Sequence, residues 1–169
     1  GFTEPDHGSD ITFLRTIAVK DGEGYRIDGV KTFISNGAIA NFVILLCQTD
    51  SEVKPTYRGQ STFIVERGSK GFEVNELGEK MGIRMTSTTE MSFDQVWVPK
   101  ENIVGELNRG FYQVLEFFDE SRVMVAAQAL GIAQGAFDRA IDYAKKREQF
   151  GQKLTEFQVT QHKLADMAT

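Results

Sequence analysis

The stretch Thr16–Ser35, "TIAVKDGEGYRIDGVKTFIS", decides the fold of the first part of the chain. Two apolar segments flank the Gly-rich sequence "DGEG", and this pattern is typical of a β-hairpin. The spacing Gly22-x-Gly24 also occurs in dinucleotide-binding loops, but in those loops a helix follows the glycines, whereas here a strand pattern follows. The stretch therefore predicts two antiparallel strands joined by a tight turn.

Short apolar segments separated by Gly, Pro, Asp and Asn continue to about Ile103. They read "FVILLCQTD", "STFIVE", "GFEVNEL" and "EMSFDQVWVP". Strands at such intervals are typical of an antiparallel barrel or sandwich, and we expect a barrel. From Asn108 the apolar residues recur every three or four positions, which predicts a long helix, and "LTEFQV" predicts the start of a second one. The sequence thus indicates an α+β chain with a β-barrel domain (1–105) and the first part of a helical domain (106–169).

Composition excludes several classes of function. The 169 residues carry a net charge of -5, and no basic run is interleaved with aromatic residues, so we expect no nucleic-acid partner. The longest apolar run, Phe42–Cys47, is too short to span a bilayer. Cys47 is the only cysteine, and we expect it to be buried and unreactive. His7 and His162 have no Cys or other His near them in the sequence, so no metal site is predicted.

The segment Lys31–Gly37, "KTFISNG", carries the first hint of chemistry. Alternate side chains of a strand share a face, so Phe33 and Ser35 should point the same way, about 7 Å apart. An aromatic ring and a hydroxyl on one face could hold a flat heteroaromatic ligand by stacking and by donation to a ring nitrogen. A core Phe followed by a turn Ser would give the same pattern, so the pair alone leaves both interpretations open.

Four motifs, taken in their order along the chain, resemble the acyl-CoA dehydrogenase family. They are "FTEPDHGSD", "FISNG", "MGIRMTSTTEMSFDQVWVPKENIVGE" and "ALGIAQGAFDRAIDYAKKREQFGQKLTEFQVTQHKLADMA". The resemblance covers essentially the whole chain, which is similar to the middle β-domain and the start of the C-terminal helical domain of that family. It implies a flavoprotein in which a base removes the α-proton of an acyl-CoA thioester while the β-hydrogen passes as hydride to flavin N5.

The same resemblance implies FAD as the cofactor, electron-transfer flavoprotein as the electron acceptor and a homotetramer or homodimer as the assembly. It also implies a cytoplasmic location, or the mitochondrial matrix in a eukaryote. The N-terminal helical domain and most of the C-terminal bundle of the family have no counterpart in the sequence, so we expect the chain to be a piece of a longer protein.

In the first domain, the resemblance implies a set of residues that contact the flavin. They are Phe2 and Thr3 at the isoalloxazine, Gly8 and Ser9 at a phosphate, and Phe33, Ile34 and Ser35 on the strand beside the ring. The Ser35 hydroxyl matches the group that bonds flavin N5, and Ser9 also faces CoA. His7 and Phe13 stand where relatives have small residues. They could crowd the loop or close one side of the pocket, and His7 could contact a ligand phosphate or have no role.

In the helical part, the resemblance implies two further sets of contacts. The substrate set consists of Asp119 and Arg122 near the CoA pantetheine and Ser121 and Val125 in the acyl pocket. The second set contacts FAD across a subunit interface and consists of Arg147, Gln149, Phe150 and Gln158. Structural alternatives remain open: an ion pair for Arg122, a helix-dipole contact for Arg147, and a capping box with Thr155 for Gln158. Gly151 is expected to end the long helix as a C-cap.

No catalytic residue is predicted within the chain. Some relatives place a catalytic Glu where this sequence has Ser121, and Glu120 is turned about 100° away from that position on a helix. Most relatives carry their Glu later in the C-terminal domain, so we expect the isolated chain to be inactive. An acyl-CoA oxidase or flavin monooxygenase of the same superfamily, or a non-catalytic binding or assembly module, are the alternative functions.

Overall fold

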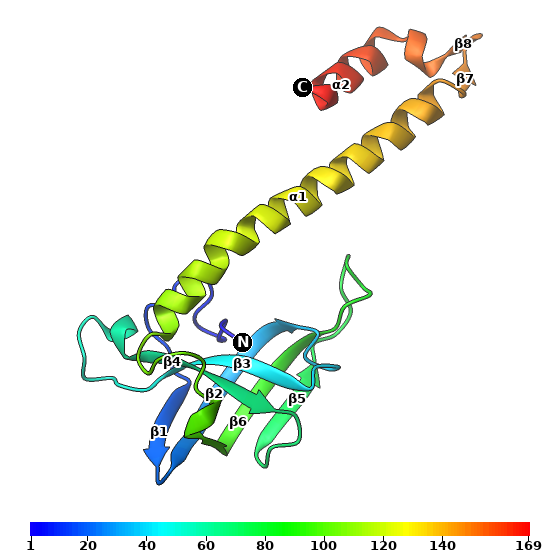
Figure 1. Ribbon diagram of the computed structural model, residues 1–169. Coiled ribbons are helices and arrows are strands. Elements are labelled where there is room, and N and C mark those ends of the chain that lie inside the picture. The colour runs from blue at the N-terminus through cyan, green and yellow to red at the C-terminus, as the bar shows by residue number, and fades with distance from the viewer. The chain divides into compact units, whose positions relative to one another are not determined.

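The computed structural model describes residues 1–169 and divides into two compact units, Gly1–Glu116 and Phe117–Thr169 (Figure 1). The first unit is built on a six-stranded sheet. Its strands are β1 (Ile17–Asp21), β2 (Gly24–Ser35), β3 (Phe42–Gln48), β4 (Gln60–Glu66), β5 (Phe72–Glu76) and β6 (Thr88–Pro99). Two short 3-10 helices, η1 (Thr56–Gly59) and η2 (Lys100–Asn102), lie in its connections.

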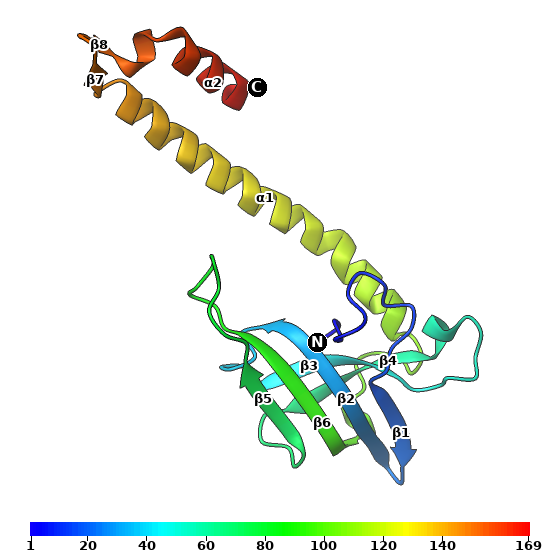
Figure 2. The same ribbon diagram turned by 180° about the vertical axis from the view of Figure 1, so that it is seen from behind.

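The sheet has the strand order β4-β3-β1-β2-β6-β5, and Figure 2 shows β1, β2, β6 and β5 side by side. All neighbours are antiparallel except β1 and β3, which meet in parallel only where Ile17 lies opposite Gln48. The α+β class is confirmed, but the predicted closed barrel is wrong, because the two outer strands, β4 and β5, do not pair with each other. A barrel needs its edge strands to pair along their length, and β5 has only five residues, all paired with β6.

The Gly-rich hairpin is confirmed. Asp21 of β1 lies opposite Gly24 of β2, and Gly22, with φ +59°, is the first central residue of the two-residue turn, where a positive φ favours glycine. A side chain at Gly24 would collide with the Val98 carbonyl at 2.3 Å and with the ring of Trp97. Both glycines are therefore explained by the hairpin and its packing against β6.

The core of the first unit is formed by alternate residues of the strands. On β3, for example, Val43, Leu45 and Cys47 all belong to one buried cluster that also contains Phe63. The expected burial of Cys47 is confirmed. Burial raises the pKa of its thiol to about 12, which disfavours the reactive thiolate form.

The segment Gly1–Thr3 lies between β3 and β2. The Gly1 nitrogen donates to the Ile44 carbonyl at 2.8 Å, and the Gly1 carbonyl accepts from the amide of Leu46 at 3.1 Å. On the other side, the amide of Thr32 donates to the Thr3 carbonyl at 2.9 Å. Because β1 meets β3 at one end only, this segment joins β3 to β2 where β1 does not.

The long helix α1 (Gly110–Ala144) begins in the first unit and continues in the second. Its first residue packs closely on β4, since a Cβ at Gly110 would lie 2.7 Å from the backbone of Ser61. One turn later Val114 is buried. The predicted long helix is therefore confirmed, and it is anchored at its start.

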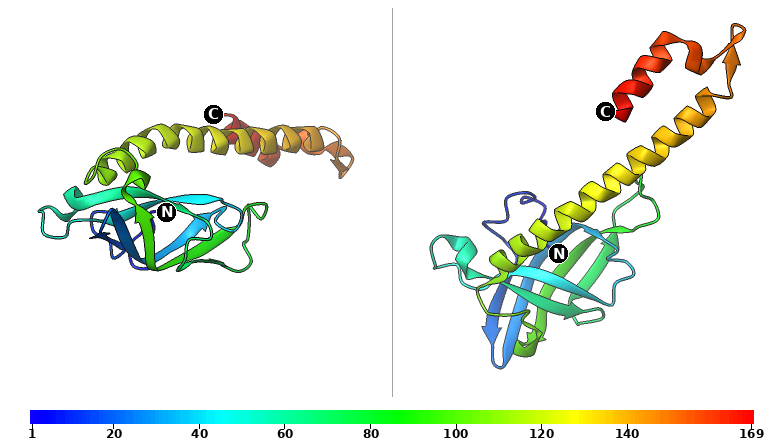
Figure 3. Two further views of the ribbon diagram at one scale, coloured as in Figure 1. Left: turned by 60° about the horizontal axis from the view of Figure 1, so that its bottom comes forward. Right: turned by 45° about the horizontal axis from the view of Figure 1, so that its top comes forward.

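Beyond α1, the second unit contains a small hairpin and a second helix (Figure 3, orange to red). Its elements are β7 (Glu148–Gln149), β8 (Gln152–Lys153), the 3-10 turn η3 (Leu154–Glu156) and α2 (Gln158–Ala168). No helix of the structure combines the length and apolar character needed to cross a membrane.

Two local expectations in this unit are wrong. Gly151 is not a helix cap, because α1 ends at Ala144 and Gly151 (φ +77°) forms the hairpin turn with Phe150 (φ +55°). The capping box of Thr155 and Gln158 is absent because η3 lies before α2, and instead the Glu156 carboxylate accepts from the Lys153 amide at 2.6 Å.

Candidate functional site

The structure brings the opening loop and β2 together, as the cofactor interpretation requires. The hydrogen bond between the Thr32 amide and the Thr3 carbonyl places Phe2 and Thr3 alongside this strand. Ser35 ends the strand three residues after Thr32. Phe33 lies between them on the same strand.

A β-bulge at Phe33 shapes this part of β2. Lys31 lies opposite Met91 and Ile34 lies opposite Thr89, so β2 contains one more residue than β6 over this interval. Phe33 has a φ of +58°, which is rare for a residue with a bulky side chain. As a result Phe33 is 67% exposed, Ile34 packs against the core and Ser35 is exposed. Simple strand alternation did not predict the bulge.

Several hydrogen-bond donors around β2 are unused within the chain. The amide and hydroxyl of Thr3, the hydroxyl of Ser35 and the amides of Gly8 and Ser9 have no partner in the chain. The Asp10 carboxylate is occupied, since it accepts from the Thr12 amide at 2.9 Å. Free amides in a turn suit an anion, and a hydroxyl and an amide beside an exposed ring suit the polar edge of a flat heteroaromatic. The donor set therefore fits a dinucleotide such as FAD.

Beneath this surface lies a buried ion pair that the sequence analysis missed. The Lys31 ammonium is 2.9 Å from the Glu4 carboxylate, and the two side chains are 0% and 2% exposed. Burial by itself would raise the pKa of Glu4, but the Lys31 charge and the amides of Arg15 and Thr16 outweigh it and hold this pKa below its usual value. Burial lowers the pKa of Lys31, and the Glu4 carboxylate opposes that effect. No local pattern indicates that a strand lysine points inward.

His7 and Phe13, the two bulky departures from the family pattern, contact each other. Their ring centroids are 5.4 Å apart, edge to face. The loop is further tied by an exposed ion pair between Arg15 and Asp6 at 2.6 Å. The two rings therefore pack against each other within the loop.

In the second unit, Arg122 forms the ion pair that was its structural alternative. Its guanidinium lies 2.8 Å from the Asp119 carboxylate, and its Nε donates to the Phe118 carbonyl at 3.1 Å. The Ser121 hydroxyl approaches the same carbonyl at 3.5 Å, and Val125 is 63% exposed. A contact of these residues with substrate stays a prediction.

The residues predicted to reach FAD across a subunit interface surround the β7–β8 hairpin. Arg147 precedes β7, and its carbonyl accepts from the Leu154 amide at 2.9 Å. The Gln149 amide group donates to the carbonyl of Glu148, and Phe150 is 95% exposed in the turn. Gln158 is the exposed first residue of α2. All four lie on this exposed stretch, and their cofactor role stays a prediction.

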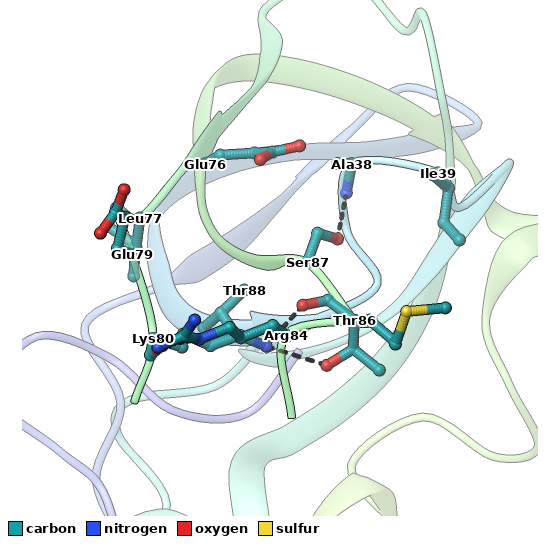
Figure 4. A pocket seen from close by; sticks show the side chains of 12 residues that line it. Ala38, Ile39, Glu76, Leu77, Glu79, Lys80, Arg84, Thr86, Ser87 and Thr88 are labelled. Atoms are coloured by element: carbon teal, nitrogen blue, oxygen red, sulfur yellow. Dashed lines mark hydrogen bonds between the residues drawn. The ribbon is translucent and has the colours of Figure 1, made fainter. Parts of the chain in front are cut away.

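A surface pocket of about 510 Å³ lies where β2 ends (Figure 4). Thr88, which lines it, is the partner of Ser35 in the sheet. Lys80 and Arg84 also line the pocket. The Lys80 ammonium donates to the Thr86 hydroxyl at 2.9 Å, and the Arg84 guanidinium donates to the Lys80 carbonyl at 2.8 Å. No pattern in the sequence indicated this pocket. No group of three or more His, Cys, Asp and Glu side chains is placed to hold a metal ion.

Comparison with known proteins identifies the family. Residues 1–96 match the family model described as "Acyl-CoA dehydrogenase, middle domain", and residues 108–169 match "Acyl-CoA dehydrogenase, C-terminal domain". The chain therefore belongs to the acyl-CoA dehydrogenase family, as its motifs predicted.

Similar proteins include a short-chain-specific acyl-CoA dehydrogenase of Clostridium acetobutylicum, which is 44% identical over 99% of this chain and 44% of its own length. A subunit of the caffeyl-CoA reductase–Etf complex of Acetobacterium woodii is 42% identical, with 99% of this chain and 44% of that protein covered. The solved structure of butyryl-CoA dehydrogenase from Megasphaera elsdenii superimposes with a TM-score of 0.93 at 42% identity, over 99% of this chain and 44% of that one. The chain thus spans less than half the length of these relatives.

Proposed function

We propose that this chain is part of an FAD-dependent acyl-CoA dehydrogenase, which oxidises an acyl-CoA thioester to the 2,3-enoyl-CoA. Membership of the family and the names of the similar proteins support this proposal. The observation that carries it is the pairing of Thr3 with Thr32, which puts unused donors next to the exposed ring of Phe33. Residues 1–105 serve as the middle domain and residues 106–169 as the start of the C-terminal domain.

Each residue of the β2 surface has a distinct task in this proposal. FAD, when bound, supplies the acceptor for the hydride that leaves the substrate. Phe33 offers an aromatic surface to the ring, and the hydroxyl of Ser35 and the amide of Thr3 donate to its heteroatoms. Gly8 and Ser9 present backbone amides to a phosphate, where they satisfy charge without needing a cationic side chain.

Substrate and assembly involve the helical unit. Ser9, Asp119, Ser121, Arg122 and Val125 bind the acyl-CoA. A second group serves the cofactor of a neighbouring subunit in a homo-oligomer and consists of Arg147, Gln149, Phe150 and Gln158. Electron-transfer flavoprotein accepts the electrons, a partner suggested by the family and by the name of the Acetobacterium woodii relative.

The base that removes the α-proton lies outside this chain in our proposal. A base must come within about 3 Å of the proton that it abstracts. Asp119 is already paired with Arg122, and Glu120 is turned about 100° away from Ser121 on the helix.

The proposal is tested by mixing the whole protein, loaded with FAD, with acyl-CoAs of several chain lengths in the absence of oxygen. Bleaching of the flavin absorbance by at least one of them is expected, and no bleaching by any would contradict the function. Slow reoxidation of the bleached flavin by air would favour a dehydrogenase, and rapid reoxidation an oxidase.

Ser35→Ala tests the cofactor face itself. One hydrogen bond contributes about 1 kcal/mol, so flavin reduction should slow about fivefold while FAD content changes less. Ser51→Ala, in an exposed loop, is the matched control and should leave the rate unchanged. Equal rates in Ser35→Ala and the unmutated protein would remove Ser35 from the site.

A further inference from the structure

The buried pair of Lys31 and Glu4 calls for a role beyond stability. Their side chains are 0% and 2% exposed and 2.9 Å apart. A buried ion pair gains little net stability, because the loss of hydration offsets the attraction, and an apolar pair of similar volume often serves as well. We therefore looked at what the charge of Lys31 does to the groups around it.

The pair connects three segments of the chain through hydrogen bonds: the opening loop, residues 15–16 and β2. The Glu4 carboxylate accepts from the amides of Arg15 and Thr16 at 2.7 and 2.9 Å. The Lys31 ammonium donates to Glu4 and also, at 3.1 Å, to the carbonyl of Phe2. Lys31 is thus the single buried cation beneath the segment that contains Phe2 and Thr3.

The contact with the Phe2 carbonyl has a directional consequence. The only cis peptide bond of the chain precedes Pro55, so the bond between Phe2 and Thr3 is trans, and its C=O and N–H groups point in opposite directions. Because Lys31 holds the carbonyl inward, the Thr3 amide points away from Lys31. The Thr3 carbonyl is itself fixed by the Thr32 amide, and the Thr3 amide has no partner within the chain.

A carbonyl bonded to a cation also polarises its peptide group. Charge-assisted hydrogen bonds are about twice as strong as neutral ones, and successive bonds strengthen one another in a low dielectric. The Thr3 amide is therefore a better donor than an ordinary loop amide, and it donates best to an acceptor that carries negative charge.

We propose that Lys31 is a positioning residue for the cofactor: by holding the Phe2 carbonyl, it aims and polarises the Thr3 amide toward the acceptor edge of the flavin. The reduced, anionic flavin gains more from this donor than the oxidised flavin does. This inference rests on the proposed function, because it needs FAD on the β2 surface.

The test removes the charge of Lys31 without leaving the Glu4 carboxylate buried and unpaired. In the whole protein, Lys31→Met combined with Glu4→Gln makes both side chains neutral at similar volume. The equilibrium constant for two-electron reduction of the bound FAD should fall about tenfold, a shift of about 30 mV in reduction potential. Binding of oxidised FAD should change less. The matched control is Lys100→Met with Glu23→Gln, the same substitutions in an exposed pair, and it should leave the potential unchanged.

A second variant separates the effect of the Lys31 charge from that of a neutral hydrogen bond to the Phe2 carbonyl. Lys31→Gln with Glu4→Gln keeps an N–H donor for the Phe2 carbonyl but removes its charge, so the potential should fall by less than in the Met variant. It also decides the question if the Met variant does not fold. Equal potentials in the unmutated protein and the variants, with only stability lowered, would overturn the inference. Failure of the unmutated protein to bind FAD would overturn the proposed function as well.

Discussion

The two units of the chain differ in their internal packing. In Gly1–Glu116, Leu45 and Phe63 are completely buried within one cluster. In Phe117–Thr169, the only buried residue is Ala144, and the apolar side chains of Leu130 and Val123 are 70% and 67% exposed. The first unit has a core of its own that can fix the position of Thr3 and Phe33. The second has helical periodicity without a core, and apolar surface of this kind is typical of an interaction site.

The same substitution made in both units tests most directly whether only the first has a packed core. Leu45→Ala should lower the free energy of unfolding by about 4 kcal/mol, because it opens a cavity in a packed core. Leu130→Ala in the same 169-residue chain should change it by less than about 0.5 kcal/mol, since the side chain is exposed. Urea unfolding followed by Trp97 fluorescence for the sheet and by circular dichroism for the helices measures both. A similar large loss for both variants would mean that the helical unit has its own core.

The second prediction concerns the buried pair that makes the first unit distinctive. The pKa of Glu4 lies below its usual value of 4.5 in the folded chain, so its stabilisation is present above that pH and is lost as the pH falls through the folded pKa. Glu4→Gln leaves the buried Lys31 without its charged partner. It should lower the free energy of unfolding by about 3 kcal/mol at neutral pH. The difference in free energy of unfolding between this variant and the unmutated chain should become smaller below about pH 4.5.

Urea titrations at several pH values measure this difference. Glu73→Gln, which changes an exposed glutamate on β5, serves as the control and should show little effect at any pH. A penalty for Glu4→Gln that is independent of pH would mean that the charge of Glu4 is not what stabilises the loop.

The smallest expected effect lies in the second unit. A Cβ at Gly131 of α1 would meet no atom within 4 Å, so Gly131→Ala should raise the stability of the helix in this chain by up to about 1 kcal/mol, through helix propensity alone. Thermal unfolding followed by circular dichroism at the helix signal tests it. Gly110→Ala, on the same helix, is the contrasting variant and should destabilise, because its Cβ would clash with Ser61. Destabilisation by Gly131→Ala would show that another helix already packs there.

The features that the sequence predicted are those that local pattern controls. The Gly22–Gly24 hairpin, the long helix and the burial of Cys47 each depend on turn chemistry or hydrophobic periodicity over a short stretch. The approach of Thr3 to β2 was predicted from the resemblance to the family rather than from any local pattern.

The features that were missed depend on residues far apart or on the exact course of the backbone. Lys31 is buried because Glu4, 27 positions earlier, meets it across the fold, and no propensity scale includes such a partner. The bulge at Phe33 follows from the register between β2 and β6. The barrel was wrong because short strands with regular turns leave open whether the first and last strands of a sheet meet.

An open sheet has consequences for how copies of the chain behave together. Unpaired strand edges are templates for aggregation. One edge is covered, because the Val104 amide donates to the Thr62 carbonyl at 2.9 Å and the side chain of Asn102 donates to Ile64. The other edge, β5, is only five residues long and carries the exposed carboxylates of Glu73 and Glu76. A short edge that carries charge disfavours pairing with the edge of a second copy, so the sheet has protection there without being closed.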